Sequence, residues 1–415
     1  MTAFQILSLL LTFTAVGAYL NYRYLKLPAT VGLMAFALVI SLAAIFLNWL
    51  GVIDLTAASG FLRQIDFSAI LLHGMLSFLL FAGALQVDLS ELQKHKIIVG
   101  LLATVGVVIA TFITGTVVWL AAGWLGFTFN YFYALLFGAL IAPTDPVAVL
   151  GLLRQVNISK NFRVKISCES LLNDGVGVVL FVVLLNIANP ELANPTPRDI
   201  AALVIWQGIG SLALGLAIGW IVSELLYKVD DYRLEALLTL AAAAGGYSLA
   251  EYIHVSAPIT MVIAGLTIGN HNIVFGRPTK VRKYVDLFWG LLDEILNAVL
   301  FVLIGLEMMV ITIHAPHLAL GLFAIVGMLV GRFVSVAIPV TLMRSRYRFE
   351  HGTIRLLTWG GLRGGISIAL ALSLPVNDEK DLILGMTYLV VVFSILFQGT
   401  TFRHVAHLVL GKKPA

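Results

Sequence analysis

The sequence has few charged residues and only one cysteine. Of its 415 residues, 12% are Asp, Glu, Lys or Arg and 60% are hydrophobic, and the mean hydropathy is +0.98. A soluble chain of this length needs more polar surface, so the composition indicates an all-α protein that crosses a membrane many times and contacts lipid. The lone Cys168 excludes an internal disulfide framework and a metal cage built from cysteines.

Other missing patterns narrow the function. No His-Glu-x-x-His motif and no nucleophile with a recognisable base is present, so we expect neither an enzyme nor a cofactor. No basic patch with interleaved aromatic residues is present, so we expect no nucleic-acid partner. The sequence contains no filter-like repeat and no ring of charged residues, which are the features of a cation channel. A channel is therefore a less favoured alternative.

Long apolar stretches fill most of the chain. A membrane-spanning helix needs roughly 20 apolar residues, and on this basis the sequence predicts thirteen spans. Their expected ranges are 3–20, 28–50, 67–86, 97–122, 130–152, 166–188, 199–226, 234–252, 256–270, 287–313, 317–343, 353–375 and 382–402.

The basic residues give the orientation of these spans. Of the 26 lysine and arginine residues, 21 fall in loops on one side and only Arg63, Arg198 and Lys380 on the other. Arg332 and Arg363 fall within spans. Because the basic side faces the cytoplasm, we expect the N-terminus outside the cell membrane and the C-terminus, with a short tail at 403–415, inside.

Two spans interrupt their own helical pattern. Pro143 and Pro146 lack the backbone N–H group, which leaves the carbonyls of Ala139 and Ala142 without their usual donors. Seven spans later, four glycines between 360 and 365 surround Arg363. This spacing predicts inverted repeats at about 1–188 and 234–402, joined by a linker helix at 199–226, with discontinuous helices facing a site near the membrane centre.

Acidic side chains lie deep in two of these spans. Asp145 is seven residues from the inner end of its span and Asp174 is eight from the inner end of the next, which places both roughly 10–12 Å from the cytoplasmic boundary. Arg363 is at a similar depth, about 15 Å. Ionisable groups at such depth cost roughly 2.5–3.5 kcal/mol each on insertion scales and usually have a function. We therefore expect an ion carrier built around the two aspartates.

Helical spacing separates the polar residues near Asp174 into two faces. Ser170 and Asp174 are four residues apart and share one face, whereas Glu169 and Asn173 share another, rotated by roughly 100°. We therefore expect Glu169 to meet a neighbouring helix, in a buried structural ion pair with Arg363.

The first face, together with the proline-broken span, can supply oxygen ligands. Carboxylates of Asp174 and Asp145, hydroxyls of Ser170 and Thr144, and freed carbonyls suit a small hard cation such as Na⁺. A buried carboxylate can hold a proton when the cation is absent, so proton and cation would compete for one site. If the empty, unprotonated site cannot cross, coupled exchange results. Asp293, Glu294 and Asn297 we expect to line the cytoplasmic approach or an interface instead of binding ions.

Several motifs, in order along nearly the whole chain, resemble one family. They are Ala142-Pro-Thr-Asp145-Pro, Glu169-Ser-Leu-Leu-Asn-Asp174-Gly, Asn297-Ala-Val-Leu-Phe-Val-Leu-Ile-Gly305, Gly360-Gly-Leu-Arg-Gly364 and Phe397-Gln-Gly399. With them the chain is identified as similar to the sodium/proton exchanger branch of the monovalent cation/proton antiporter superfamily.

The resemblance implies a thirteen-span fold with core and dimerisation domains, usually as a homodimer. It implies that Asp174 carries the cation and the proton, that Asp145, Thr144 and Ser170 complete the cation site, and that Glu169 and Arg363 form the family's buried pair. Asn173 in place of a second aspartate resembles the electroneutral exchangers.

Two features depart from the family pattern. Many relatives have an acidic residue in the third span, where this chain has Ala82, so the choice of cation is open. The chain also stops soon after its last span, which favours a prokaryotic carrier without a long regulatory tail. The leading hypothesis is exchange of Na⁺, with Li⁺ also accepted, for H⁺, and the alternative is exchange of K⁺ for H⁺.

Overall fold

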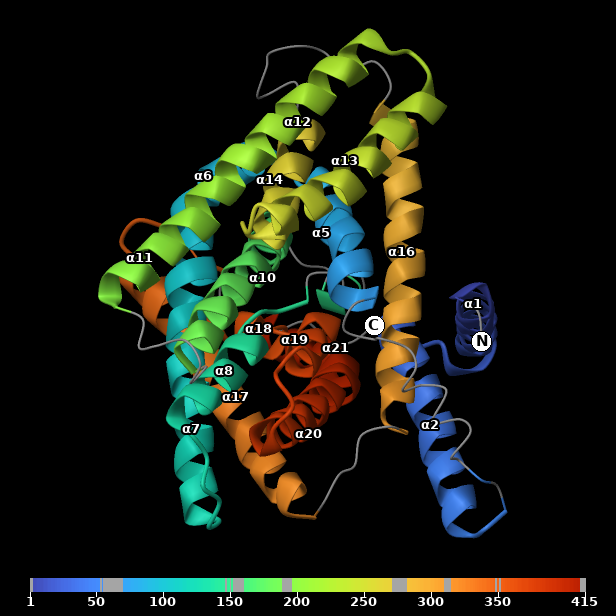
Figure 1. The fold of residues 1–415 in the computed structure, drawn as a ribbon, viewed down its shortest axis with the longest axis vertical. Coiled ribbons are helices and arrows are strands. Elements are labelled where there is room, and N and C mark those ends of the chain that lie inside the picture. The colour runs from blue at the N-terminus through green and yellow to red at the C-terminus, as the bar shows by residue number, and fades with distance from the viewer. Residues whose placement is uncertain are drawn as a thin grey trace.

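The computed structural model describes residues 3–52, 54, 70–145, 148–149, 151, 160–188, 196–270, 282–309, 315–347, 349–350 and 352–410. Every regular element in these ranges is helical, which confirms the all-α prediction (Figure 1). The α-helices are α1 (Ala3–Leu20), α2 (Ala29–Trp49), α5 (Leu76–Leu85), α6 (Leu89–Leu101), α7 (Val107–Trp124), α8 (Tyr131–Ile141), α10 (Lys160–Ala188), α11 (Pro197–Ile205), α12 (Ser211–Lys228), α13 (Tyr232–Tyr252), α14 (Ala257–Gly269), α16 (Arg282–Glu307), α17 (Ala315–Leu342), α18 (Thr353–Trp359), α19 (Gly365–Leu372), α20 (Asp378–Val392) and α21 (Gly399–Leu410). Short π-helical turns are η1 (Asn21–Leu25), η2 (Ile70–Met75), η3 (Leu102–Gly106), η4 (Trp206–Gly210) and η5 (Phe393–Gln398).

Many of these helices can cross a membrane. Within the described ranges, eight helices are long and apolar enough to do so, and three shorter apolar helices, α5, α8 and α14, lie among them. The number of thirteen spans stays a prediction. Several boundaries differ from the predicted ones, since α10 starts at Lys160, α16 ends at Glu307 and α21 continues to Leu410. Helix α6 starts at Leu89, where Asp88 caps the helix by accepting from the Ser90 N–H at 2.9 Å.

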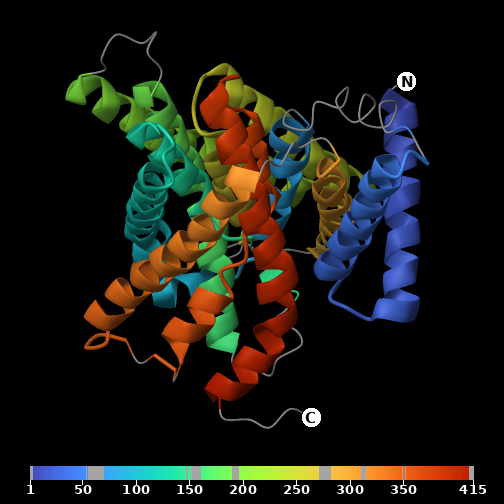
Figure 2. The same ribbon diagram turned by 90° about the horizontal axis from the view of Figure 1, so that it is seen from below.

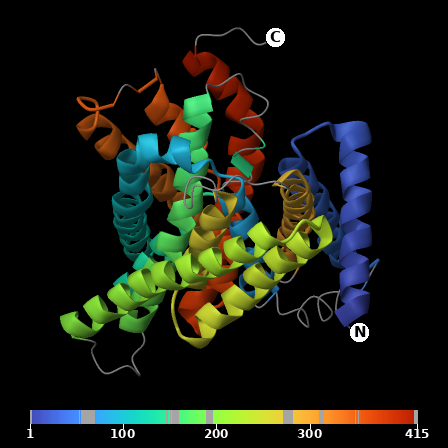
Figure 3. The ribbon, with the colours of Figure 1, turned by 90° about the horizontal axis from the view of Figure 1, so that it is seen from above.

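The helices form three packed groups around α10. In Figure 2, α1 and α2 lie together at one flank and α7 lies at the opposite flank. Figure 3 shows α12 and α13 as a band along one side of the molecule. The buried side chains follow this arrangement: one cluster joins α2, α16 and α18, a second joins α7, α8, α17 and α20, and a third joins α5, α13 and α14. The two interrupted spans are therefore enclosed by other helices and not by lipid.

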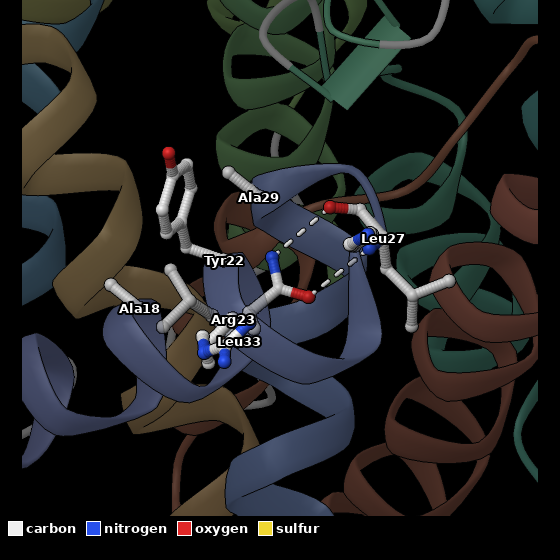
Figure 4. Close-up of a pocket in the computed structure, with 8 residues that line it drawn as sticks. Ala18, Tyr22, Arg23, Leu27, Ala29 and Leu33 are labelled. Atoms are coloured by element: carbon white, nitrogen blue, oxygen red, sulfur yellow. Dashed lines mark hydrogen bonds between the residues drawn. The ribbon is translucent and has the colours of Figure 1, made fainter.

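One buried asparagine holds the turn between α1 and α2. Asn21 donates from Nδ2 to the Leu27 carbonyl at 3.0 Å and accepts from the Leu27 N–H at 3.2 Å (Figure 4). Beside this turn, a cavity of about 630 Å³ is lined by Arg23 and Lys26. The first 53 residues contain no aspartate or glutamate. No acidic residue of this helix pair can therefore compensate the positive charge of Arg23 and Lys26.

Candidate functional site

The first interruption follows the proline motif. Helix α8 ends at Ile141, and residues 142–145 are not helical. The last regular bond runs from the Ala142 N–H to the Gly138 carbonyl at 2.9 Å. The next residue, Pro143, has no N–H to continue the series. The predicted break in this span is confirmed.

The second interruption lies at the glycine motif. Helix α18 ends at Trp359, α19 starts at Gly365, and residues 361–364 between them are not helical. This break is also confirmed.

The two interruptions cross each other. The Asp145 N–H donates to the Leu362 carbonyl at 2.8 Å, which joins the two non-helical segments directly. The Ser367 hydroxyl donates to the Leu140 carbonyl at 2.7 Å. Polar backbone from both broken helices is thus satisfied by the other one, inside the protein, as a membrane requires.

Arg363 binds the carbonyls at the end of α8. Its Nη1 donates to the Ala142 carbonyl at 2.5 Å and to the Pro143 carbonyl at 2.6 Å, and its side chain is 1% exposed. Ala142 is one of the carbonyls that the prolines were predicted to free for an ion. In the structure, this carbonyl accepts from the guanidinium group.

Glu169 forms its ion pair with a different arginine from the one predicted. Nη1 and Nη2 of Arg332 donate to the two carboxylate oxygens of Glu169 at 2.7 and 2.8 Å, and Arg332 Nε donates to the Leu357 carbonyl at 3.2 Å. Glu169 is 0% and Arg332 5% exposed. The prediction of a buried pair at Glu169 is therefore right, but Arg363 as its partner is wrong.

The sequence contained a signal for this pairing. Arg332 is the one charged residue of its predicted span, 317–343, so it needed a buried acidic partner as much as Arg363 did. Both arginines were possible partners, because position along a helix does not say which neighbouring helix lies opposite.

Asn173 connects this ion pair to the first interruption. Its Nδ2 donates to Glu169 Oε1 at 3.0 Å and to Thr144 Oγ1 at 2.9 Å, and its Oδ1 accepts from the Thr144 N–H at 3.2 Å. Glu169 and Asn173 thus share one helix face, as the spacing predicts. The hydroxyls of Thr144 and Ser170 lie 2.9 Å apart in a hydrogen bond. Thr144 therefore forms three hydrogen bonds with side chains of α10.

Asp174 lies on the neighbouring face of α10 and borders a cavity. Its side chain is 2% exposed, and Oδ2 has no hydrogen-bond partner among the described residues. The cavity has a volume of about 40 Å³, enough for about one water molecule or one small cation. Its lining comprises Asp145, Asp174, Asn297, Pro143, Gly364, Gly365, Ile366, Ser367, Leu300, Leu76, Leu79 and Leu80.

The lining agrees only partly with the predicted cation ligands. Asp145 and Asp174 both border the cavity, whereas Thr144 and Ser170 lie outside its lining, bonded to each other. Asn297 was not predicted as a ligand, yet it lines the cavity and is 4% exposed. Its Nδ2 donates to the carbonyl and to Oδ1 of Asp293 at 2.8 and 3.0 Å, which leaves Oδ1 of the amide as the atom that can face an ion.

Ala82 does not border this cavity. Helix α5 contributes Leu76, Leu79 and Leu80 to the lining, whereas Ala82 is 1% exposed within the cluster of α5, α13 and α14. Ala82 is therefore part of the close apolar packing next to the site.

A substitution at Gly364 tests whether transport depends on the position of Asp145. A Cβ at this position would collide with the carboxylate of Asp145, although its φ of −121° is open to any residue. We expect Gly364→Ala to displace Asp145 and to lower ion transport strongly while changing the melting temperature little. The matched control is Gly290→Ala on α16, where a Cβ would meet nothing within 4 Å. Equal transport by both variants would show that the position of Asp145 is unimportant.

Comparison with known proteins agrees with the motifs. The family model described as "Sodium/hydrogen exchanger, transmembrane" matches residues 9–408. The Na⁺/H⁺ antiporter NhaP of Pseudomonas aeruginosa is 46% identical over 97% of this chain and 96% of its own length. The Na⁺/H⁺ antiporter NhaH of Halobacillus dabanensis is 30% identical over 95% of each chain. The structure of the sodium proton antiporter MjNhaP1 from Methanocaldococcus jannaschii shares the fold, with a TM-score of 0.77 at 21% identity over 99% of both chains. The chain belongs to the sodium/hydrogen exchanger family of membrane transporters.

Proposed function

We propose that this protein exchanges Na⁺ for H⁺ across a cell membrane and that Asp174 carries both ions in turn. The observation that supports this most directly is a small cavity lined by two carboxylates, Asp145 and Asp174, at the crossing of two broken helices. One oxygen of Asp174 has no partner among the described residues, so a ligand can bind there without displacing a protein group. The relatives named as Na⁺/H⁺ antiporters support the same substrates.

The chemistry of the site suits competition between the two ions. Two carboxylates and the amide oxygen of Asn297 are hard oxygen ligands for Na⁺. When Na⁺ leaves, a proton on Asp174 removes the cost of an uncompensated buried charge. Arg363 stays bound to the carbonyls of 142 and 143 and supplies a fixed positive charge near the site. Thr144, Ser170 and Asn173 position the segment that carries Asp145.

We propose that the exchange is electroneutral, with one Na⁺ for one H⁺. Asn173 is uncharged, and its amide group already binds Glu169 and Thr144. Asp174 then remains as the one carboxylate of this motif that changes its ligand during the cycle. A single carboxylate that carries either one proton or one Na⁺ transfers no net charge.

Reconstituted protein tests both statements. Proton flux is measured in proteoliposomes with a pH gradient after addition of Na⁺, Li⁺ or K⁺, with and without a clamp on the membrane potential. We expect Na⁺ and Li⁺ to dissipate the gradient regardless of the clamp. Dissipation by K⁺ alone would identify K⁺ as the substrate. A flux that depends on the clamp would exclude electroneutral exchange. Ion currents without a pH response would favour a channel.

The same preparation tests competition for one site. Because protons occupy Asp174 more often as the pH falls, we expect the half-saturating Na⁺ concentration to rise as the pH is lowered. A half-saturating concentration that is independent of pH would mean separate sites for the two ions.

The crossing of the broken helices also supports the predicted arrangement of repeats. We propose that 1–188 and 234–402 are inverted repeats joined by the helix of 199–226, that the N-terminus lies outside and the C-terminus inside, and that the protein forms a homodimer. Each broken helix comes from a different repeat, and the two meet through Asp145 and Leu362. Accessibility of single cysteines introduced at Arg23 and Lys380, on opposite sides in this topology, tests the orientation.

A further inference from the structure

A third acidic group lies buried at the far end of α16. Glu307 is the last residue of that helix and is 8% exposed. In the part of the chain that the structure describes, its carboxylate has no hydrogen bond and no ion pair. Helix α2, which meets Gly305 near this end through Ala37 and Ser41, contains no Asp, Glu, Lys, Arg or His.

Two effects oppose a bare negative charge at this position. Burial without a partner costs the carboxylate its hydration, and the C-terminal end of a helix already has partial negative charge. The helix does end here, since the Met309 N–H bonds to the Leu306 carbonyl at 3.0 Å in a tighter turn. The Ser41 hydroxyl donates to the Gly305 carbonyl at 2.8 Å, so it is also committed to the backbone. Glu307 therefore needs a proton or a cation.

A second polar group near Glu307 also lacks a partner. Tyr388 of α20 is 1% exposed, and within the described residues its hydroxyl has no hydrogen-bond partner. Tyr388 packs in the same buried cluster as Ile304 and Leu306, which neighbour Glu307 on α16. Buried polar groups without a protein partner usually mark a place for water or an ion. Here the tyrosine belongs to the buried cluster in which α16 ends at Glu307.

The position of Glu307 relates it to the candidate site. Asn297, Leu300, Ile304 and Glu307 follow each other at intervals of three or four residues and so share one face of α16. Asn297 and Leu300 line the cavity with Asp174. Glu307 is seven residues beyond Leu300, or about 10 Å along the helix axis. Ile304, 0% exposed, lies between them, so one apolar layer separates Glu307 from the cavity in this conformation.

We propose that Glu307, with the Tyr388 hydroxyl, forms a second site that binds H⁺ or Na⁺ on the extracellular route to Asp174. The inference rests on the proposed function and orientation, in which this end of α16 faces outward. The site holds an ion that arrives from outside while the apolar layer at Ile304 is closed. Movement of this layer then admits the ion to the cavity of Asp174.

Chemical labelling tests the binding step without transport. Dicyclohexylcarbodiimide reacts with protonated carboxyl groups in apolar surroundings, and mass spectrometry of peptides separates Glu307 from Asp174. We expect labelling of Glu307 in the purified full-length protein, protection by Na⁺, and loss of this adduct in Glu307→Gln. The exposed Asp381 of α20 serves as the unlabelled reference. No adduct at Glu307, or an adduct indifferent to Na⁺, would overturn the proposal.

Transport from each side tests the route. In oriented proteoliposomes, we expect Glu307→Gln to raise the half-saturating Na⁺ concentration severalfold from the outer side and to leave the inner side unchanged, with partial recovery in Glu307→Asp. Asp381→Asn, which removes an exposed carboxylate from α20, is the control. An equal change on both sides would indicate a structural role for Glu307. If the wild type exchanges no Na⁺ at all, the proposed function fails, and the labelling result still decides the site at Glu307.

Discussion

We expect Asp174→Asn to reduce Na⁺-driven proton flux to the level of protein-free liposomes. The substitution keeps the shape of the side chain but removes the group that can alternate between a proton and a cation. Asp174 lies against the cavity with one oxygen unpartnered among the described residues, so no bond within the protein is lost. The measurement is initial flux per amount of reconstituted protein over a range of Na⁺ concentrations.

The stability of the variant distinguishes loss of the carrier from loss of the fold. Asp174→Asn should melt at the wild-type temperature or above it, because a buried charge without a partner does not stabilise the folded state. Asp381→Asn, which removes an exposed carboxylate from α20, should keep wild-type flux. Substantial exchange by Asp174→Asn would contradict the role of Asp174, whatever its melting temperature.

Asp145 should behave differently from Asp174. The Asp145 side chain is tied to its own segment, since its Oδ1 accepts from the Ala148 N–H at 3.1 Å, and its N–H binds the Leu362 carbonyl. Replacing it therefore changes the crossing of the broken helices as well as the ligand set. For this reason Asp174 is the sharper test of the carrier role.

The sequence predicts features that depend on one helix at a time. Proline and glycine motifs give both breaks, and helical spacing puts Asn173 beside Glu169 and Asp174 on another face. Depth along the span places Asp145, Asp174 and Arg363 at similar levels. In the structure, hydrogen bonds join the segments of Asp145 and Arg363, and Asn173 joins α10 to Thr144.

Features that depend on which helices lie opposite each other could not be predicted in this way. Arg332 and Arg363 were both expected to be buried and so needed partners. The spacing of residues does not say which arginine binds the Glu169 carboxylate and which binds the backbone carbonyls. Asn297 was expected to line the cytoplasmic approach or an interface, because its span follows a basic loop and has polar residues only in its first part. It borders the cavity because α16 packs against α5 and α19.

The second large effect that we expect is a loss of stability when the ion pair of Glu169 and Arg332 is broken. We expect Arg332→Gln to lower the stability by about 3–5 kcal/mol, because it leaves Glu169 charged, 0% exposed and without its two guanidinium donors. Glu169→Gln should have a comparable effect, since it leaves the Arg332 charge buried. The double variant should be more stable than either single variant, because neither charge remains. Thermal unfolding of the four proteins in one detergent provides the comparison.

Variants of Arg363 test which of the two arginines is coupled energetically to Glu169. In the structure, Arg363 donates to the carbonyls of Ala142 and Pro143, so Arg363→Gln removes donors from the backbone but strands no carboxylate. The effects of Glu169→Gln and Arg363→Gln should therefore be nearly additive, whereas those of Glu169→Gln and Arg332→Gln should not. Strong coupling of Glu169 to Arg363 together with additivity for Arg332 would restore the pairing expected from the sequence. Because Arg363 holds the segment that carries Asp145, its substitution should impair transport more than its effect on melting suggests.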